Sequence, residues 1–246
     1  FEKIKRIDSN YKDAAGLQKE ARLAGLMTIA LTLPPDDARR YPRFYRLAEA
    51  GIKTRIHQLQ HPFIQLVSPE HTAMMIEEQR RALAENRPVN EDALIPVRVV
   101  FSGKMMQYQT DQMAQKRTER KAWLRQEDRQ RNVSYKKVNY FEVEQGSLVQ
   151  FTYAYDFVSA ESARVIIAGK VSQTYRDAVK YAVSSFNADD IVPGDWGDGV
   201  KDTMYTDSGR RSAMRTLFSA RKELKTAADY EPDFSSFVAV DVVKKL

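Results

Sequence analysis

The residues best suited to metal chemistry are the three histidines, His57, His61 and His71. His57 and His61 are four positions apart, a spacing that brings two imidazoles to one face of a helix, as in some zinc sites. No Asp or Glu lies close to this pair in the sequence, and Pro62 follows it immediately. We therefore predict helix-end histidines that interact with the last backbone carbonyls, and no metal.

Acidic and glycine-rich segments are the next candidates. Asp189 and Asp190 are adjacent carboxylates, which serve as general acid and base only where their environments separate their pKa values. The stretch from Gly194 to Gly199 resembles a calcium loop superficially but lacks the ligand spacing of an EF-hand. The sequence has no Walker-type or dinucleotide phosphate motif, no serine in a nucleophile elbow and no cysteine. We therefore predict a protein that is not an enzyme and has no cofactor.

Basic residues interleaved with aromatic ones form the third candidate. A positive groove can follow phosphates while rings stack on bases, so the region 112–141 is an alternative candidate for nucleic-acid binding. Aromatic residues that alternate along a strand more often pack across strands and in the core. We therefore predict protein partners and do not expect nucleic acid. The predicted interaction residues are Tyr140, Phe141, Phe151, Tyr153, Tyr155, Arg117, Arg120 and Lys121.

The elements that position these residues begin with a helix over 13–23 and a short apolar strand over 26–33. Apolar residues at three-and-four spacing predict a helix over 42–59, and a second short strand follows over 63–67. Serine and proline then begin a helix over 68–86. This order predicts a layered α/β sheet whose first two strands are parallel, because the connection between them is long.

A further strand is predicted over 94–102. The stretch 112–132 then carries many arginines and lysines, which predicts a solvated helix or a mobile insertion outside the core. The glycine- and aspartate-rich stretch 189–199 predicts a loop. Two closing helices are predicted over 212–228 and 234–246.

Aromatic residues dominate the most strand-like part of the chain. Side chains alternate over 138–143, and Phe151, Tyr153, Tyr155 and Phe157 share one face of a following strand. With a turn at Gln145 and Gly146 and a third strand over 164–167, these segments predict an antiparallel meander.

Composition places the chain among globular proteins. Its 246 residues are 43% hydrophobic and 29% charged, with a formal net charge of +6. No apolar run approaches the roughly 20 residues of a membrane-spanning helix. We predict one α/β (α+β) domain over 1–246, with a mixed sheet, helices packed on it and a charged insertion at 112–132.

The order of these elements resembles the bacterial envelope lipoprotein family that includes the curli secretion channel (CsgG type) and the amino-terminal domain of TolB. The matching pieces are the elements between Leu26 and Asn86, the strand from Leu94 to Gly103, and the strands and loop from Phe151 to Gly169. The segment from Val158 to Ile167 is the best match. The resemblance covers about residues 26 to 175, most of the chain.

The resemblance implies a TolB N-terminal-like fold and a non-enzymatic scaffold or assembly protein. Such a protein acts by oligomerisation and protein–protein contacts in a secretion or surface-assembly complex, as a homo-oligomer or in a multi-subunit envelope complex. The implied location is the periplasm, in association with the outer membrane. The family's lipidated amino-terminal cysteine is missing here, and we expect a chain processed before Phe1, where a lipid anchor would attach it to the membrane.

Overall fold

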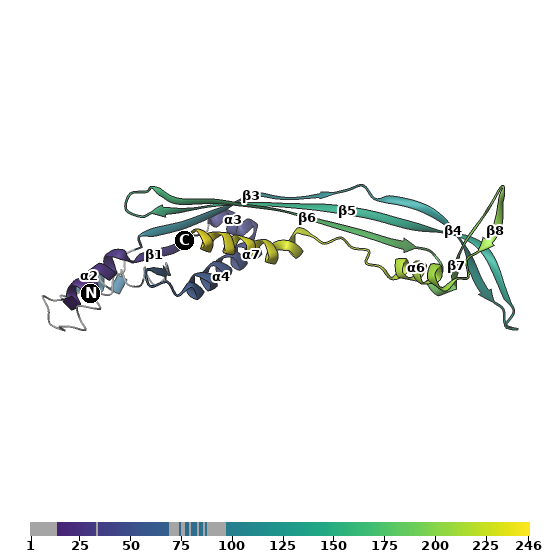
Figure 1. Ribbon diagram of the computed structural model, residues 1–246, viewed down its shortest axis with the longest axis horizontal. Helices are drawn as coiled ribbons and strands as arrows, with labels where there is room; N and C mark the ends of the chain where they lie inside the picture. The colour runs from purple at the N-terminus through teal and green to yellow at the C-terminus, as the bar shows by residue number, and fades with distance from the viewer. Residues whose placement is uncertain are drawn as a thin grey trace. The chain divides into compact units, whose positions relative to one another are not determined.

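The strands form one mixed sheet that is not closed, with helices packed on it (Figure 1), which confirms the predicted α/β fold class. The computed structural model describes residues 14–246 apart from 33, 69–73, 75, 76, 79, 83, 86 and 88–96. The sheet order is β2-β1-β3-β5-β4-β7-β8, and β6 pairs with β5. Within the described ranges, every helix is too short or too polar to cross a membrane.

The chain divides into two compact units, which we describe separately. Unit 1 comprises Phe1–Tyr108, Phe151–Gln173 and Glu231–Leu246, and unit 2 comprises Gln109–Gln150 and Thr174–Tyr230. The strands β3 (Val99–Gln112), β5 (Val133–Ser159) and β6 (Val165–Val183) contribute residues to both units. That all 246 residues form one domain stays a prediction.

Unit 1 contains four elements predicted from the first part of the sequence, α2 (Ala14–Gly25), β1 (Met27–Thr32), α4 (Pro42–Leu59) and β2 (Ile64–Val67). It also contains the short helix α3 (Pro35–Arg40), which was not predicted, and most of the closing helix α7 (Ala227–Lys245). Each of α3 and α4 begins at a proline. Proline suits the first helical position because an N–H group there would have no partner within the helix, so its absence costs nothing. β1 pairs in parallel with β2 and with β3, which confirms the predicted parallel start of the sheet. The helix predicted over 68–86 and His71 lie partly or wholly outside the described residues.

Aromatic side chains fill the core of unit 1. Phe151, Tyr153, Tyr155 and Phe157 are each at most 1% exposed, which confirms that they share one buried face of β5. From α7, Phe234 stacks on Phe151 with ring centroids 4.9 Å apart. A Cβ at Gly103 would overlap the Tyr153 hydroxyl, so β3 needs glycine where this ring lies against it.

Unit 2 contains β4 (Lys116–Glu127), η3 (Ala188–Asp190), β7 (Ile191–Gly197), β8 (Val200–Met204) and α6 (Ser208–Ser219). β4 pairs antiparallel with both β5 and β7, and β7 pairs antiparallel with β8. Its buried cluster is formed by Ala122, Leu124, Val138, Tyr140, Ala182, Ile191 and Met214, with Leu217 and Phe218 packed against it.

The prediction of a solvated helix or mobile insertion over 112–132 is wrong. This stretch contains β4, and its residues Ala122, Trp123 and Leu124 are buried. The many charges belong to positions that remain exposed along the strand. A strand with charged, exposed positions therefore resembles an insertion in composition while still contributing to a core.

Two other local predictions are also wrong. Gln145 and Gly146 lie inside β5, which runs for 27 residues without a turn, so this part of the sheet is not the predicted three-strand meander. The Gly146 carbonyl accepts a hydrogen bond from Met113 N at 2.9 Å, which keeps this backbone extended. The stretch 189–199 is mostly β7 instead of a loop. The two closing helices are confirmed as α6 and α7, although both begin earlier than predicted and α6 ends at Ser219, nine residues before the predicted end.

Candidate interaction surfaces

Three of the eight predicted interaction residues lie in the core of unit 1. Phe151, Tyr153 and Tyr155 are buried, so their side chains present no surface to a partner in this structure. Burial raises the pKa of Tyr153 far above its usual range. The Tyr155 hydroxyl donates a hydrogen bond to Asp241 Oδ2 at 2.6 Å, which joins β5 to α7.

The other five predicted residues lie in unit 2, where their side chains contact neighbouring residues of the same unit. Tyr140 is buried against Phe218, with ring centroids 5.7 Å apart, and burial raises the pKa of Tyr140 to about 12. Arg120 donates to Glu142 Oε2 at 3.2 Å. Arg117 lies over the Phe141 ring, with its guanidinium carbon 3.8 Å from the ring centroid. Cation–π contact of this kind gives a modest attraction at an exposed site.

Both tryptophans of the chain lie beside lysines on the same side of unit 2. Lys121 donates to the Trp196 carbonyl, and its ammonium lies 5.0 Å from the Trp196 ring centroid. Lys137 lies opposite Trp123 in the β4–β5 register and forms an ion pair with Asp202 at 2.8 Å. These two lysines therefore have partners within the unit. Sequence reasoning missed Trp196 because its contacts come from strands far apart along the chain.

The turn that joins β4 to β5 is built around Asp128. Its Oδ1 accepts hydrogen bonds from Gln130 N and Asn132 N, both at 2.8 Å, and its Oδ2 accepts one from Asn132 Nδ2 at 3.0 Å. These hydrogen bonds hold the pKa of Asp128 below its usual range. The spacing of Asp128 and Asn132 between two strands is a turn signal that the sequence does carry.

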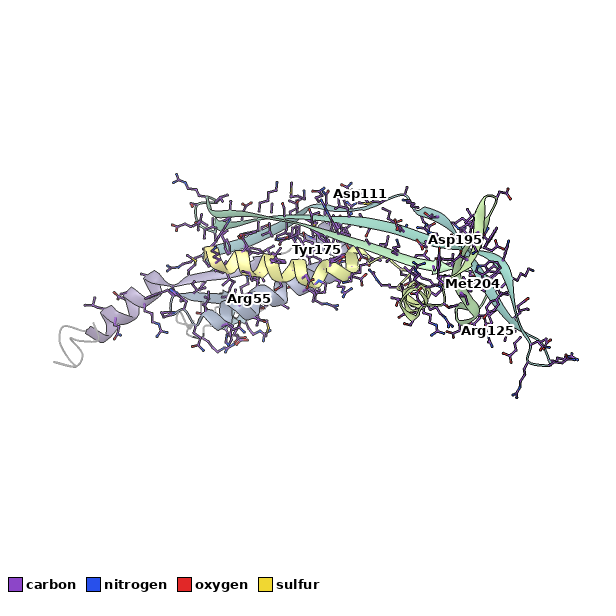
Figure 2. All side chains as sticks on the ribbon, turned by 45° about the vertical axis from the view of Figure 1, so that its right-hand side comes forward. Arg55, Asp111, Arg125, Tyr175, Asp195 and Met204 are labelled. Carbon is purple, nitrogen blue, oxygen red and sulfur yellow. The ribbon has the colours of Figure 1, made fainter. Side chains whose placement is uncertain are left out.

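We call residues 125–137, around this turn, the hairpin tip; Figure 2 labels Arg125 in it. It holds five basic and two acidic residues. One basic residue, Arg125, pairs with Glu127 at 2.7 Å. The side chains of Arg129, Arg131 and Lys136 form no ion pair or hydrogen bond with any described residue. Val133 and Tyr135 beside them are 44% and 43% exposed.

A second surface follows β6 in unit 1. We call residues 165–173 the β6 edge, because β5 is the strand with which β6 pairs in the described part of the sheet. Exposure alternates along it: Ile166, Ala168, Lys170 and Ser172 are exposed, and the residues between them are partly or fully buried from Ile167 onward. Val165 and Ile166 are 58% and 51% exposed.

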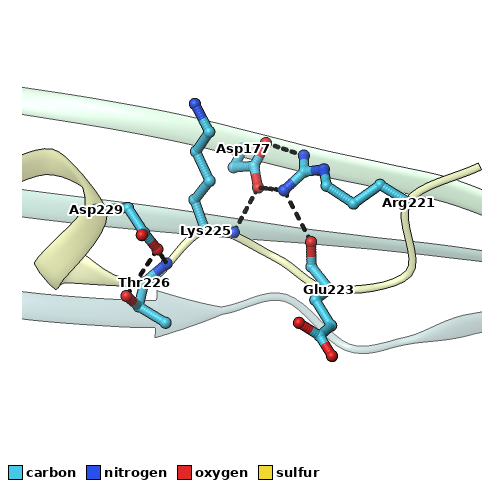
Figure 3. Close-up of polar contacts among 6 residues, drawn as sticks. All are labelled: Asp177, Arg221, Glu223, Lys225, Thr226 and Asp229. Atoms are coloured by element: carbon cyan, nitrogen blue, oxygen red, sulfur yellow. Dashed lines mark hydrogen bonds and ion pairs between the residues drawn. The ribbon is translucent and has the colours of Figure 1, made fainter.

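In unit 2, hydrogen bonds join β6 to the segment that precedes α7 (Figure 3). Arg221 donates to both oxygens of Asp177, at 2.6 and 2.8 Å, and Lys225 N donates to Asp177 Oδ2 at 2.7 Å. These bonds lower the pKa of Asp177 to about 2. Thr226 then caps α7 through hydrogen bonds with Asp229. We call the Asp177–Arg221–Lys225 contacts the β6 clamp.

His57 and His61, the two histidines that the structure describes, belong to no group of side chains fit for a metal. His57 lies in the last turn of α4, and His61 Nδ1 accepts a hydrogen bond from Phe63 N at 3.3 Å. The part of the chain that the structure describes contains no cluster of three or more His, Cys, Asp or Glu side chains fit for a metal. The buried carboxylate of Glu231 accepts a hydrogen bond from Tyr108 at 2.9 Å and lies 3.9 Å from Arg43.

No protein-family model matches the chain, and no curated protein sequence matches it significantly.

Proposed function

We propose that this protein is a non-enzymatic assembly protein of the bacterial cell envelope, which acts by oligomerisation through the β6 edge. The observation that carries the proposal is the single strand neighbour of β6 among the described strands. A strand with one neighbour has backbone N–H and C=O groups on its other side, and those without a partner in the chain can hydrogen-bond to a strand of another chain. The Ala168 carbonyl already accepts a hydrogen bond from Lys245 Nζ at 3.2 Å.

A second copy of this chain can pair with the β6 edge more favourably in the antiparallel than in the parallel direction. Lys170 is the one charged residue between 165 and 173. Antiparallel self-pairing centred on Gly169 places Lys170 opposite Ala168, whereas parallel pairing in register places two lysines opposite each other. Like charges directly opposite destabilise a strand pair, so antiparallel pairing is favoured. Antiparallel pairing of two identical strands also gives the self-complementary interface of a symmetric dimer.

The exposed apolar residues at one end of the β6 edge support the same interface. Val165 and Ile166 are half exposed, and burial of such side chains against a second strand is favourable. The envelope location and a role in a secretion or surface-assembly complex are supported by the resemblance of the element order to the CsgG-type and TolB families. An outer-membrane-associated periplasmic location forms part of the proposal.

Light scattering coupled to size-exclusion chromatography tests the oligomer. One chain has a mass of 28.3 kDa, and we expect the wild type at a multiple of this mass across a range of salt concentrations. The variant with Val165→Lys and Ile166→Lys should elute as a monomer, because lysines on an edge oppose strand addition. The matched control is Leu59→Lys with Val240→Lys, two exposed apolar positions on helices of unit 1. A monomeric wild type, or an equal effect of the control, contradicts the proposal.

A further inference from the structure

We infer that the hairpin tip binds the surface of a membrane that contains anionic phospholipids. This inference goes beyond the proposed assembly function and uses no residue of the β6 edge. It rests on three features of residues 125–137: cations without acidic partners, a rigid turn that displays them, and apolar side chains beside them.

Three of the five cations of the hairpin tip are available to a partner, since Arg125 and Lys137 already form ion pairs. Arg129, Arg131 and Lys136 make no ion pair with any described residue, and all three are exposed. Of the two acidic residues, Glu127 pairs with Arg125. The other, Asp128, points its carboxylate into the turn, where two backbone N–H groups and the Asn132 amide hold it. The outward charge of the tip is therefore positive.

The turn is also preorganised. Asp128 N donates to the Asn132 carbonyl at 3.1 Å, and Arg131 N donates to the Asp128 carbonyl at 3.0 Å. Together with the side-chain bonds of Asp128, these contacts fix the backbone on which Arg129 and Arg131 stand. A fixed backbone reduces the conformational entropy that binding would otherwise cost.

The apolar neighbours distinguish this tip from a purely polar one. Tyr135 lies opposite Arg125 in the register, and Val133 lies opposite Glu127, so both side chains are on one face of the ribbon. Tyrosine is enriched where a protein meets the headgroup region of a bilayer, since its ring is apolar and its hydroxyl is polar. The arginines of the adjacent turn attract the negative surface of the membrane, and Lys136, on the opposite face of the ribbon, adds to the positive charge of the tip.

A phospholipid surface fits this arrangement better than a nucleic acid. A nucleic-acid site needs a row of cations that follows the phosphates over several nucleotides. Here the cations that would continue such a row along the strands already have partners: Lys137, at the inner end of the hairpin tip, pairs with Asp202, and Lys121 beyond it donates to the Trp196 carbonyl. The unpaired positive charge is therefore concentrated at the end of the hairpin. Val133 cannot stack on a base, but it can enter the acyl boundary.

Vesicle sedimentation tests the inference on the whole chain. We expect binding to vesicles of phosphatidylglycerol and phosphatidylcholine at low salt, and at least tenfold weaker binding to vesicles of phosphatidylcholine alone. The test variant carries Arg129→Gln and Arg131→Asn; asparagine suits position 131 because its φ is 65°. With about a fivefold loss for each charge, this variant should bind about twenty-fivefold more weakly.

The matched control carries Arg39→Gln and Arg46→Gln, which removes the same charge from exposed helix positions of unit 1. It should bind within about twofold of the wild type. The inference is overturned if both variants lose the same amount of vesicle binding. It is also overturned if the wild type binds equally to vesicles with and without phosphatidylglycerol. Tighter capture of a single-stranded oligonucleotide than of vesicles at equal phosphate, lost in the same tip variant, also overturns it in favour of nucleic acid. Thermal unfolding of each variant confirms that it is folded, and Arg129→Gln alone repeats the test with a smaller expected loss of about fivefold.

Discussion

The strand β5 is buried in unit 1 and largely exposed at its start in unit 2. Between Phe151 and Phe157, the residues of one face are at most 1% exposed, whereas all five residues from Val133 to Lys137 are exposed. The helices differ in the same sense: α4 and α7 of unit 1 have 18 and 19 residues, and α6 of unit 2 has 12. Longer covering helices bury more of a strand.

This difference suggests that unit 1 contributes most to the stability of the fold and that unit 2 presents the surface for binding. The aromatic core of unit 1 removes large apolar surfaces from water, which is the main favourable contribution to folding. Unit 2 has a core of mostly aliphatic side chains and displays the cations of the hairpin tip. We therefore expect substitutions in unit 1 to act mainly on the free energy of unfolding, and substitutions at the tip to act mainly on binding.

Replacing Phe234 by Ala should have the largest effect. Phe234 is fully buried and stacks on Phe44 and Phe151, with ring centroids 5.5 and 4.9 Å away. Loss of such a ring leaves a cavity and should lower the free energy of unfolding by about 4 kcal/mol, measured by urea denaturation.

The same helix supplies the control for this substitution. Phe237 is 49% exposed, so Phe237→Ala should change the free energy of unfolding by less than about 0.5 kcal/mol. Comparable losses at both positions would mean that the aromatic core of unit 1 is not what stabilises it.

Removing the carboxylate of the β6 clamp should lower the free energy of unfolding by a smaller amount, which depends on pH. Asp177 accepts charge-assisted hydrogen bonds, so Asp177→Asn should cost about 2 kcal/mol at neutral pH. Because the folded pKa of Asp177 is about 2, below its ordinary 3.8, the stabilisation is present above pH 3.8 and is lost as the pH falls toward 2. Urea denaturation at pH 7 and pH 3 measures this change.

The wild type and the Asp177→Asn variant should therefore differ less at pH 3 than at pH 7. Asp198→Asn is the control, because Asp198 is exposed and makes no contact of this kind with a described residue. A difference in the free energy of unfolding between wild type and Asp177→Asn that is the same at both pH values would show that the carboxylate charge does not stabilise the clamp.

The smallest effect is expected at the hairpin tip. Asp128→Ala removes the acceptor of Gln130 N and Asn132 N. We expect faster hydrogen exchange of these two amides, with unchanged exchange in β5 beyond Val138. Protection that persists at both amides would show that the backbone alone holds the turn.

Local signals were sufficient to predict α4 and the buried face of β5. Pro42 and the spacing of Phe44, Ile52 and Ile56 define α4 to the residue, because a helix buries one stripe of its own sequence. The alternation of Phe151, Tyr153 and Tyr155 similarly reports a face of one strand. Such patterns involve neighbours in the sequence, and no distant residue is needed to interpret them.

The errors arise where distant residues decide the structure. β4 pairs with β7 as well as β5, so Leu124 is buried opposite Ile191, which lies far along the chain. Gly146 remains extended because Met113 bonds to it. The β6 clamp joins Asp177 to Arg221, 44 residues away, and no local pattern indicates that pair. The surfaces we propose depend on such contacts and were therefore only partly predictable.

The contrast between the β4–β5 hairpin and the β1–β3 pair has a consequence for the order of folding. The hairpin closes through the short turn at Asp128 and can form as soon as both strands exist, at little cost in chain entropy. The parallel pair joins Ile29 to Val99 and must close a loop of about 70 residues. During synthesis β1 can pair with β2 first, since Met27 and Ile64 are only 37 residues apart, whereas its other edge stays unpaired until β3 has left the ribosome.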